Sequence, residues 1–266
     1  LVAQGRWAEL AHWVGGKRRS MKHIVGGSLM LRSRQLAETR VLRRARHVLC
    51  NSEATAREVH GRIGVPTRRL SVLKLGFNPG QLRPLGLARE PELLVLGRHD
   101  PHKNLRRLLQ AVAALRDREH RIHFVGPHDR RYTPKLQAMA QELGIASRCR
   151  WTAWVSNDER LELLNRARAL VIPSLWEGFG LPALEAMACG TPVLASTAGA
   201  LPEVVGEVAV PLDPMQPGQM AAAIDGFLQS SAQQQQLAQQ GPQRAAGFSW
   251  RQTGAELKQR LQELCP

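Results

Sequence analysis

The sequence has few cysteines, few aromatic residues and no long apolar run. Its four cysteines lie far apart and form no C-x-x-C pair, which argues against a disulfide framework or a zinc site and favours a reducing, cytoplasmic compartment. Arg, Gly, Pro or Glu interrupts every apolar stretch before it reaches the roughly eighteen residues of a membrane-spanning helix. The first residues show no signal-peptide pattern. These absences predict a globular, cytoplasmic protein.

Two common nucleotide-binding motifs are also missing. No G-x-x-x-x-G-K-[ST] occurs, so an ATPase P-loop is unsupported, and no G-x-G-x-x-G follows a predicted strand, so NAD binding is unsupported too. No cluster of His, Cys, Asp or Glu has the spacing of a metal site, and we expect neither a metal nor another cofactor. Neither absence excludes a diphosphate ligand.

Positive charge is concentrated in the first third of the chain. Residues 1–90 hold 18 Lys and Arg against 5 Asp and Glu, whereas residues 91–266 hold 19 against 17. Such a face attracts nucleic acid or an anionic membrane surface, or it is simply a set of solvated helices rich in arginine. The only aromatic residues before Phe77 are Trp7 and Trp13, so we expect no nucleic acid as partner and favour the inner face of a membrane.

From Glu92 onward, short apolar runs alternate with amphipathic stretches. Continuous apolar runs are typical of strands buried on both faces of a parallel sheet. The alternation predicts βαβ units, hence a doubly wound α/β sheet that binds ligands at the carboxyl ends of its strands. The expected strands are Leu93–Gly97, Ile122–Gly126, Cys149–Thr152, Ala169–Pro173 and Pro192–Ala195, and the expected helices cover roughly 104–117, 134–143, 157–167, 182–189, the tail from 216 and 251–264.

The front of the chain is less regular. Residues 1–46 read as helical, with glycine pairs as breaks. The apolar run His47–Cys50 leads into Asn51-Ser52, a typical helix cap, so it predicts a strand that feeds a helix. Leu70–Leu75 predicts a second strand. The segment 76–88, rich in Gly, Pro and Asn, predicts a linker and a domain boundary.

Two cations lie at the end of the first strand of the regular half. Arg98 follows that strand, and Lys103 precedes its helix. A guanidinium, an ammonium and a helix N-terminus together suit a phosphate group. Either residue alone would be an ordinary surface cation. Their convergence at a strand end favours a phosphate site.

The stretch "SLWEGFGLPALEAMACG" places two acids in an otherwise apolar, glycine-rich run. Its position predicts Glu177 on a loop and Glu185 in the first turn of a helix, both directed toward the strand ends. Glycines between them allow close approach of a backbone to a ligand. Since a carboxylate only accepts hydrogen bonds, the pair suits a ligand rich in hydroxyl groups. The alternative is that Glu177 is a solvated loop residue and that Glu185 caps its helix or forms a salt bridge within it.

Several ordered motifs together resemble one known family. They are the E-x7-E run from Glu177 to Glu185, "LVLGRHDPHKNLRRLLQA", "HFVG", "LLNRARALVIPSLWEGFGLPALEAMACGTPVLAS" and "GALPEVVGEVAVPLDP". About residues 90–264 resemble the nucleotide-binding half of the retaining GT-B glycosyltransferases of family 4, also called glycosyl transferases group 1. The resemblance implies two Rossmann-like domains, the second of which binds a nucleotide-sugar donor.

The resemblance also implies roles for particular residues. Glu177 would bind hydroxyls of the donor sugar and act at the reacting face, and Glu185 would hold the ribose hydroxyls. The remaining donor-binding residues would be Arg98 and Lys103 at the diphosphate, Gly178, Phe179, Gly180 and Leu181 through their backbone, and Val155 at the base. Family members usually need no metal. His99, His102 and His128 also lie near strand ends, where we expect solvated loop histidines.

Family members carry an N-terminal domain of comparable size, whereas only about ninety residues precede the matching half here. We therefore expect 1–88 to be a partial N-terminal, acceptor-side domain with its linker in an N-terminally truncated member. Residues 89–248 would form the nucleotide-sugar domain, and 249–266 a C-terminal helix that packs back toward the N-terminal domain. Leu75-Gly76-Phe77-Asn78 stands where Asn-Gly-Val-Asp is more usual.

Three functions of different class remain at this point. The first is transfer of a mannose-like or glucose-like hexose from a GDP-, UDP- or ADP-sugar to a glycan or lipid-linked hydroxyl, with retention. The second is a non-catalytic half that only binds a nucleotide sugar. The third, a nucleic-acid binder, rests on charge alone. The sequence does not identify the sugar or the acceptor.

Overall fold

The computed structural model describes residues 36–116 and 119–264. They form two compact units, one comprising 36–74 with 258–264 and the other comprising the described part of 75–257. Most of the segment predicted to be helical over 1–46 lies outside the described residues. A helix over 36–44 is the part that belongs to them.

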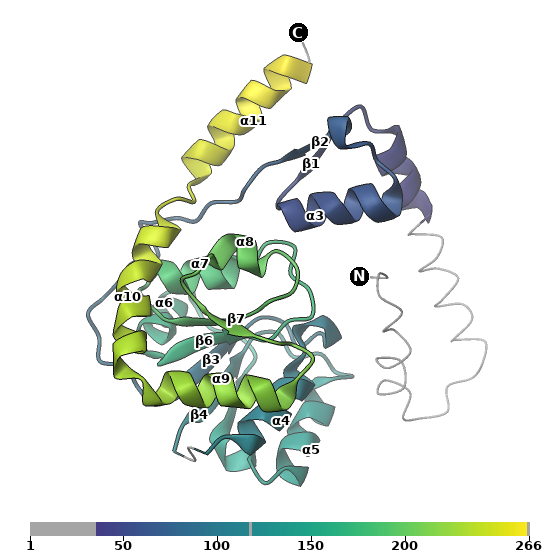
Figure 1. Cartoon of the computed structure of the whole chain (residues 1–266). Coiled ribbons are helices and arrows are strands. Elements are labelled where there is room, and N and C mark those ends of the chain that lie inside the picture. Colours follow the sequence, from purple (N-terminus) through teal and green to yellow (C-terminus); the bar gives the residue numbers. More distant parts are fainter. Residues whose placement is uncertain (1–35, 117–118, 265–266) are drawn as a thin grey trace, which may run out of the picture. The chain divides into compact units, whose positions relative to one another are not determined.

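The larger unit is built on a parallel sheet with the order β5-β4-β3-β6-β7-β8 (Figure 1). Among the described residues, five of these strands begin and end within one residue of a predicted run. The sixth, β8, was not predicted, because a three-residue strand containing Pro211 has no clear pattern. The strands are β3 (Glu92–Leu96), β4 (Arg121–Val125), β5 (Cys149–Thr152), β6 (Ala169–Ile172), β7 (Val193–Ser196) and β8 (Val210–Leu212).

Helices cover both faces of this sheet. Helices α4, α5 and α9 pack together on one side, and α6, α7 and α8 pack together on the other (Figure 1). Buried side chains of β6, β7 and α7 share one hydrophobic core. The helices are α4 (Leu105–Ala114), α5 (Thr133–Glu142), α6 (Asn157–Arg166), α7 (Leu181–Ala188), α8 (Leu201–Val205), α9 (Pro217–Gln229), α10 (Ser231–Ala245) and α11 (Trp250–Leu264).

The direction of strand order reverses between β3 and β6. From β3 the chain builds the sheet outward through β4 to β5, and from β6 it builds outward in the other direction through β7 to β8. Loops that leave the carboxyl ends of β3 and β6 therefore lead toward opposite faces, and in sheets of this kind the ligand-binding crevice lies between two such loops. This reversal predicts where a ligand of the larger unit binds.

Two helix boundaries differ from the prediction in ways that affect the site. Asn104 has a φ of 58°, the left-handed region, so it precedes α4 instead of opening it, and α4 ends at Ala114, before residue 117. Helix α7 begins at Leu181 after Gly180, which has a φ of 105°. Glu185 is the fifth residue of α7 and therefore lies in its second turn, so its placement in the first turn was wrong.

Residues 76–88 belong to the larger unit, and polar contacts hold them against the rest of it. The Asn165 side chain accepts from the amide of Leu85 at 2.7 Å and donates to the carbonyl of Arg83 at 3.1 Å, while Leu82 is buried in the core. Just after this segment, the Arg89 guanidinium donates to the carbonyls of Leu164, Ala167 and Gly190 and to the Thr191 hydroxyl. The proposed domain boundary at 88/89 stays a prediction.

The smaller unit contains one parallel βαβ unit, the repeat of a Rossmann-like sheet. Strand β1 (Val48–Cys50) is followed by α3 (Glu53–Glu58), a π-helical turn at Val59–Ile63 and β2 (Leu70–Val72), which pairs with β1 in parallel. Ser52 caps α3 by accepting from the amide of Thr55, as predicted. Strand β2 ends at Val72, before the predicted Leu75.

Candidate functional site

A pair of opposite charges lies at the point where the strand order reverses. Lys103 follows β3 in a short 3-10 turn, and its Nζ donates to Glu177 Oε1, on the loop after β6, at 2.7 Å. Ser174 Oγ donates to the same carboxylate oxygen at 2.6 Å. The Lys103 and Glu177 side chains are 18% and 12% exposed. Glu177 therefore reaches the crevice as a partly buried acceptor that two donors hold in one orientation.

The two loops that carry this pair are joined by further hydrogen bonds. The amide of Leu175 donates to the carbonyl of His102 at 2.8 Å. The carboxamide of Asn104 donates to the carbonyl of Pro173 at 2.9 Å and to that of Pro214, after β8, at 2.7 Å. Asn tolerates the left-handed backbone better than most residues, and its two N–H groups match two acceptors. Burial and the neighbouring Lys103 ammonium lower the pKa of His102.

Glycine is required where backbone segments meet behind Glu177. Gly199 has a φ of 67°, and a Cβ on it would lie 2.7 Å from the carbonyl oxygen of Glu177. The amide of the next residue, Ala200, donates to that carbonyl at 3.0 Å. The loop after β7 therefore packs directly against the backbone of Glu177 and holds its carbonyl by a hydrogen bond.

The second acid, Glu185, is held by a cation that the sequence did not reveal. Arg160 Nη1 donates to both carboxylate oxygens of Glu185, at 3.0 and 3.1 Å. Arg160 lies in the first turns of α6, whose start is fixed by a capping box between Ser156 and Glu159. Burial raises the pKa of the Glu185 carboxyl, and the Arg160 guanidinium opposes that rise.

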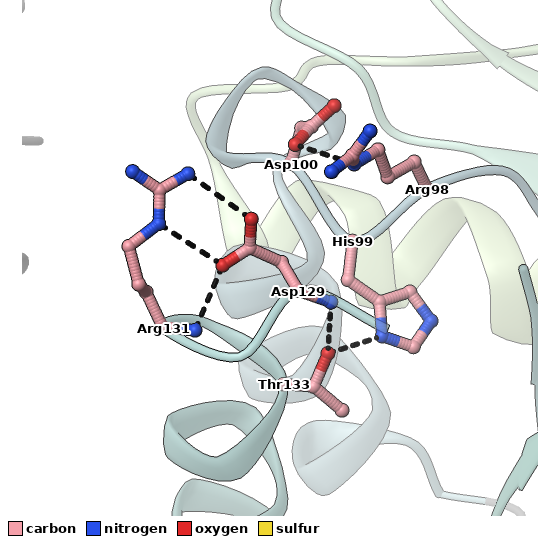
Figure 2. Close-up of polar contacts among 6 residues, drawn as sticks. All are labelled: Arg98, His99, Asp100, Asp129, Arg131 and Thr133. Atoms are coloured by element: carbon pink, nitrogen blue, oxygen red, sulfur yellow. Dashed lines mark hydrogen bonds and ion pairs between the residues drawn. The ribbon is translucent and has the colours of Figure 1, made fainter. Parts of the chain in front are cut away.

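The two cations that were predicted to bind a phosphate have different partners in the structure. Arg98 pairs with Asp100, with 3.6 Å between Nε and Oδ1, and its side chain is 60% exposed (Figure 2). Lys103 turns toward Gly97 and Glu177: a Cβ on Gly97 would lie 3.5 Å from the Lys103 ammonium. Lys103 thus belongs to the crevice, and Arg98 lies at its solvent-exposed rim.

The expectation that His99 is a solvated loop residue was wrong. His99 is 1% exposed, its ring stacks on His128 at 5.1 Å between centroids, and it meets Trp151 edge-on. Its Nδ1 lies 2.9 Å from Thr133 Oγ1, which also accepts from the amide of Asp129 (Figure 2). Burial lowers the pKa of His99 from 6.5 to about 4, and neighbouring His128 adds to the effect. The ring is therefore neutral at pH 7.

The remaining predicted residues lie on the loops around the crevice. Val155 is partly buried and its side chain packs against the core of the larger unit. Phe179 is 4% exposed, and its ring meets Phe248 edge-on, so only its backbone can face a ligand. Gly178 and Gly180 flank Phe179 on the same loop, and Leu181 opens α7. Their roles stay predictions.

Sequence reasoning missed Ser174, Asn104 and Arg160. Ser174 begins the motif that contains Glu177, so its spacing could have indicated a donor to that carboxylate. The partner of Glu185 could not be read in this way, because Arg160 is 25 residues away and on another helix.

Metal and membrane features are absent from the part of the chain that the structure describes. Within 36–116 and 119–264, no three His, Cys, Asp or Glu side chains are grouped to hold a metal ion. Over the same residues, no helix is both long enough and apolar enough to cross a bilayer. Cys50, Cys149 and Cys189 are free thiols, and burial raises the pKa of Cys149 and of Cys189 to about 11.

In a doubly wound parallel sheet, ligands bind at the switch point of the strand order, and this is where Lys103 and Glu177 lie. The family model described as "Glycosyl transferases group 1" matches residues 83–244, more than half of the chain, and the chain therefore belongs to this family. The parallel α/β architecture agrees with the expected GT-B fold, with a Rossmann-like C-terminal domain and part of an N-terminal one.

Relatives with assigned activities are considerably longer. The chain is 36% identical over 231 residues to the MMP alpha-(1->4)-mannosyltransferase of Mycolicibacterium hassiacum. This alignment covers 82% of this chain and 54% of the relative. It is 34% identical over 279 residues to the D-inositol 3-phosphate glycosyltransferase of Geodermatophilus obscurus, covering 95% and 61%. The chain thus spans little more than half the length of these relatives.

A similar solved structure is that of HepE from Anabaena in complex with UDP and glucose. It superposes with a TM-score of 0.77 at 21% identity, covering 86% of this chain and 66% of that one. At this identity the similarity concerns the fold alone.

Proposed function

We propose that the larger unit binds a nucleotide diphosphate sugar at the crevice between β3 and β6. The observation that carries this proposal is the Lys103–Glu177 pair, joined at 2.7 Å across the point where strand order reverses. An ammonium has three donors and Glu177 uses one, so two remain for diphosphate oxygens. The HepE complex with UDP and glucose and the sugar-transferring relatives support a donor of this class.

In this proposal each acid contacts a different end of the donor. Glu177 accepts from hydroxyls of the hexose, while Lys103 and, from the rim, Arg98 stabilise the negative charge that develops on the departing diphosphate. Gly178, Phe179, Gly180 and Leu181 contribute backbone groups. Glu185 accepts from the ribose hydroxyls, and the Val155 backbone contacts the base.

The proposed reaction is retaining transfer of a mannose-like or glucose-like hexose to a hydroxyl of a glycan or lipid-linked acceptor, without a metal or other cofactor. The mannosyltransferase and inositol phosphate glycosyltransferase relatives support hexosyl transfer. The second candidate is a half that binds the donor without turning it over. Since this chain spans 54% and 61% of those relatives, turnover belongs to the proposal and has to be measured on the chain itself.

Calorimetric titration with UDP-glucose, GDP-mannose and ADP-glucose, with and without EDTA, tests the binding. We expect one of them to bind in either condition, and Glu185→Ala to weaken that binding about tenfold, the loss of one or two hydrogen bonds to a charged group. Glu162→Ala is the matched control, since Glu162 is an exposed acid of α6. No binding of any of the three would contradict the proposal.

Turnover of the bound donor separates the two candidates. Glu177→Ala should leave donor affinity within about threefold and reduce donor hydrolysis or transfer about a hundredfold, as removal of a group that acts in the transition state does. Binding without any turnover by the parent chain would leave only the second candidate. Equal and negligible effects of Glu177→Ala and Glu185→Ala would show that the motif is misplaced.

We further propose that the smaller unit associates with an anionic membrane surface at its cytoplasmic face. The supporting observation is a set of exposed cations in 36–74, against two exposed acids, Glu38 and Glu53. Binding to vesicles with anionic lipid should weaken when salt rises from about 0.05 to 0.5 M. Salt-independent binding would contradict this suggestion. The exposed cations are Arg40, Arg43, Arg44, Arg46, Arg57, Arg62, Arg68 and Lys74.

A further inference from the structure

Glu185 occupies an environment that opposes its charge. It lies between fully buried Leu184 and Ala186 on α7, and its side chain is 16% exposed. Burial raises the pKa of its carboxyl. A protonated carboxyl has one fixed donor and fewer acceptor sites than a carboxylate, so it matches ligand hydroxyls poorly.

Arg160 is placed to counter this effect. Its Nη1 bridges both oxygens of Glu185, at 3.0 and 3.1 Å, and the charge and hydrogen bonds of the guanidinium favour the ionised carboxyl. One bridging nitrogen occupies one position on each oxygen and leaves the other lone pairs to a ligand. The Cys189 thiol, just after α7, also lies near Glu185, and the Glu185 charge adds to the effect of burial in raising the pKa of this thiol.

The guanidinium retains a donor that the protein does not use. Arg160 Nε is buried and has no hydrogen-bond partner within the described residues. The Nε atoms of Arg69 and Arg168 are buried in the same way, so the feature that sets Arg160 apart is its two hydrogen bonds to the Glu185 carboxylate.

We propose that Arg160 is a positioning residue that keeps Glu185 ionised and fixes the orientation of its carboxylate toward the hydroxyls of a nucleotide sugar. This inference rests on the proposed donor binding. A structural role alone would affect stability, whereas a positioning role makes ligand affinity depend on pH once Arg160 is removed.

The decisive variant is Arg160→Met, which retains an apolar stem and removes the charge. UDP-glucose and GDP-mannose are suitable probes, because neither carries a terminal phosphate that titrates near neutrality. We expect Arg160→Met to lose affinity as pH falls through the raised midpoint of Glu185, by about tenfold for each unit below that midpoint, while the parent keeps its affinity over the same range.

Three further variants isolate the effect. Arg160→Lys should restore most of the affinity and flatten the pH profile, because it returns a cation. Glu185→Gln should weaken binding equally at every pH, and adding Arg160→Met to it should introduce no pH dependence. Arg166, a partly exposed cation of the same helix, pairs with Glu162, and Arg166→Met should behave as the parent.

A measurement without ligand keeps the inference separable from the proposed function. Carboxyl carbon NMR of glutamate-labelled protein, assigned with Glu185→Gln, should show the Glu185 midpoint rising by at least about one pH unit in Arg160→Met. An unchanged midpoint, or an Arg160→Met binding profile as flat as the parent's, would overturn the inference. Failure of the parent to bind either nucleotide sugar would instead overturn the proposed function.

Discussion

The loop between β3 and α4 contributes to two neighbourhoods that differ in charge. Through Lys103 it reaches a partly exposed ion pair with Glu177, whereas through His99 it reaches a buried, neutral cluster with Thr133 and Trp151. Only three residues lie between His99 and Lys103 in the sequence. A single loop thus keeps charge on one side and aromatic packing on the other, and substitutions on the two sides should have different consequences.

The largest expected effect is on stability, on the neutral side. Because the folded-state pKa of His99 is about 4 instead of 6.5, the unfolded chain binds a proton between these values that the folded chain excludes. Stability is present above pH 6.5 and falls as pH drops toward 4, by up to about 3 kcal/mol from this group. Urea unfolding at pH 7 and pH 4.5 measures how much unfolding free energy each protein loses on acidification. His99→Gln should lose less than the parent, and equal losses would contradict the lowered pKa of His99.

The next effect is on ligand affinity, on the charged side. Lys103→Met should weaken nucleotide-sugar binding about ten- to a hundredfold, because a charge-assisted hydrogen bond contributes about 1.5–3 kcal/mol. Arg106→Met, an exposed cation in the first turn of α4, is the matched control. Calorimetry of both variants checks this, and similar affinities would show that total charge, and not the position of Lys103, attracts the ligand.

A smaller effect is expected from the backbone behind the charged side. Gly199→Ala places a Cβ 2.7 Å from the Glu177 carbonyl oxygen at a φ of 67°, so it should destabilise the fold by about 1–3 kcal/mol and displace Glu177. Gly218→Ala is the control, since a Cβ there meets nothing within 4 Å. Thermal unfolding compares them, and two indistinguishable midpoints would mean that the loop adapts freely.

The smallest effect is expected at the rim. The Arg98 side chain is 60% exposed and its ion pair with Asp100 is long, so Arg98→Met should cost no more than about 1 kcal/mol of ligand binding. A loss as large as that of Lys103→Met in the same titration would show that Arg98 turns into the crevice when the ligand arrives.

The alternation of strands and helices was predictable because buried parallel strands read as unbroken apolar runs. Leu93 to Leu96 and Leu170 to Ile172 are such runs, and β3 and β6 follow them closely. The order of the strands was not predictable, because the sequence does not show which apolar runs pair with each other in the sheet. The pairing of β3 with β6, which places the crevice, emerged only in the structure.

At the site, the two acids were recognisable from their spacing, but their partners were not. Lys103 and Glu177 are 74 residues apart, and Arg160 and Glu185 lie on separate helices, so each pairing depends on how the elements pack. His99 was misread for the same reason. Its position after a strand predicts an exposed loop residue, whereas in the structure the following loop and the ring of Trp151 bury it.

The hydrogen bonds of Asn104 have a consequence for the entropy of binding. Its carboxamide joins the segments that follow β3, β6 and β8 through the carbonyls of Pro173 and Pro214. These segments therefore lose their conformational entropy together when the protein folds, and not when a ligand binds. Asn104→Asp would place a carboxylate against two carbonyl oxygens, so both hydrogen bonds would be lost. The three segments would then be less ordered in the unliganded protein. If the proposed donor binds here, Asn104 preorganises its site without needing to contact it.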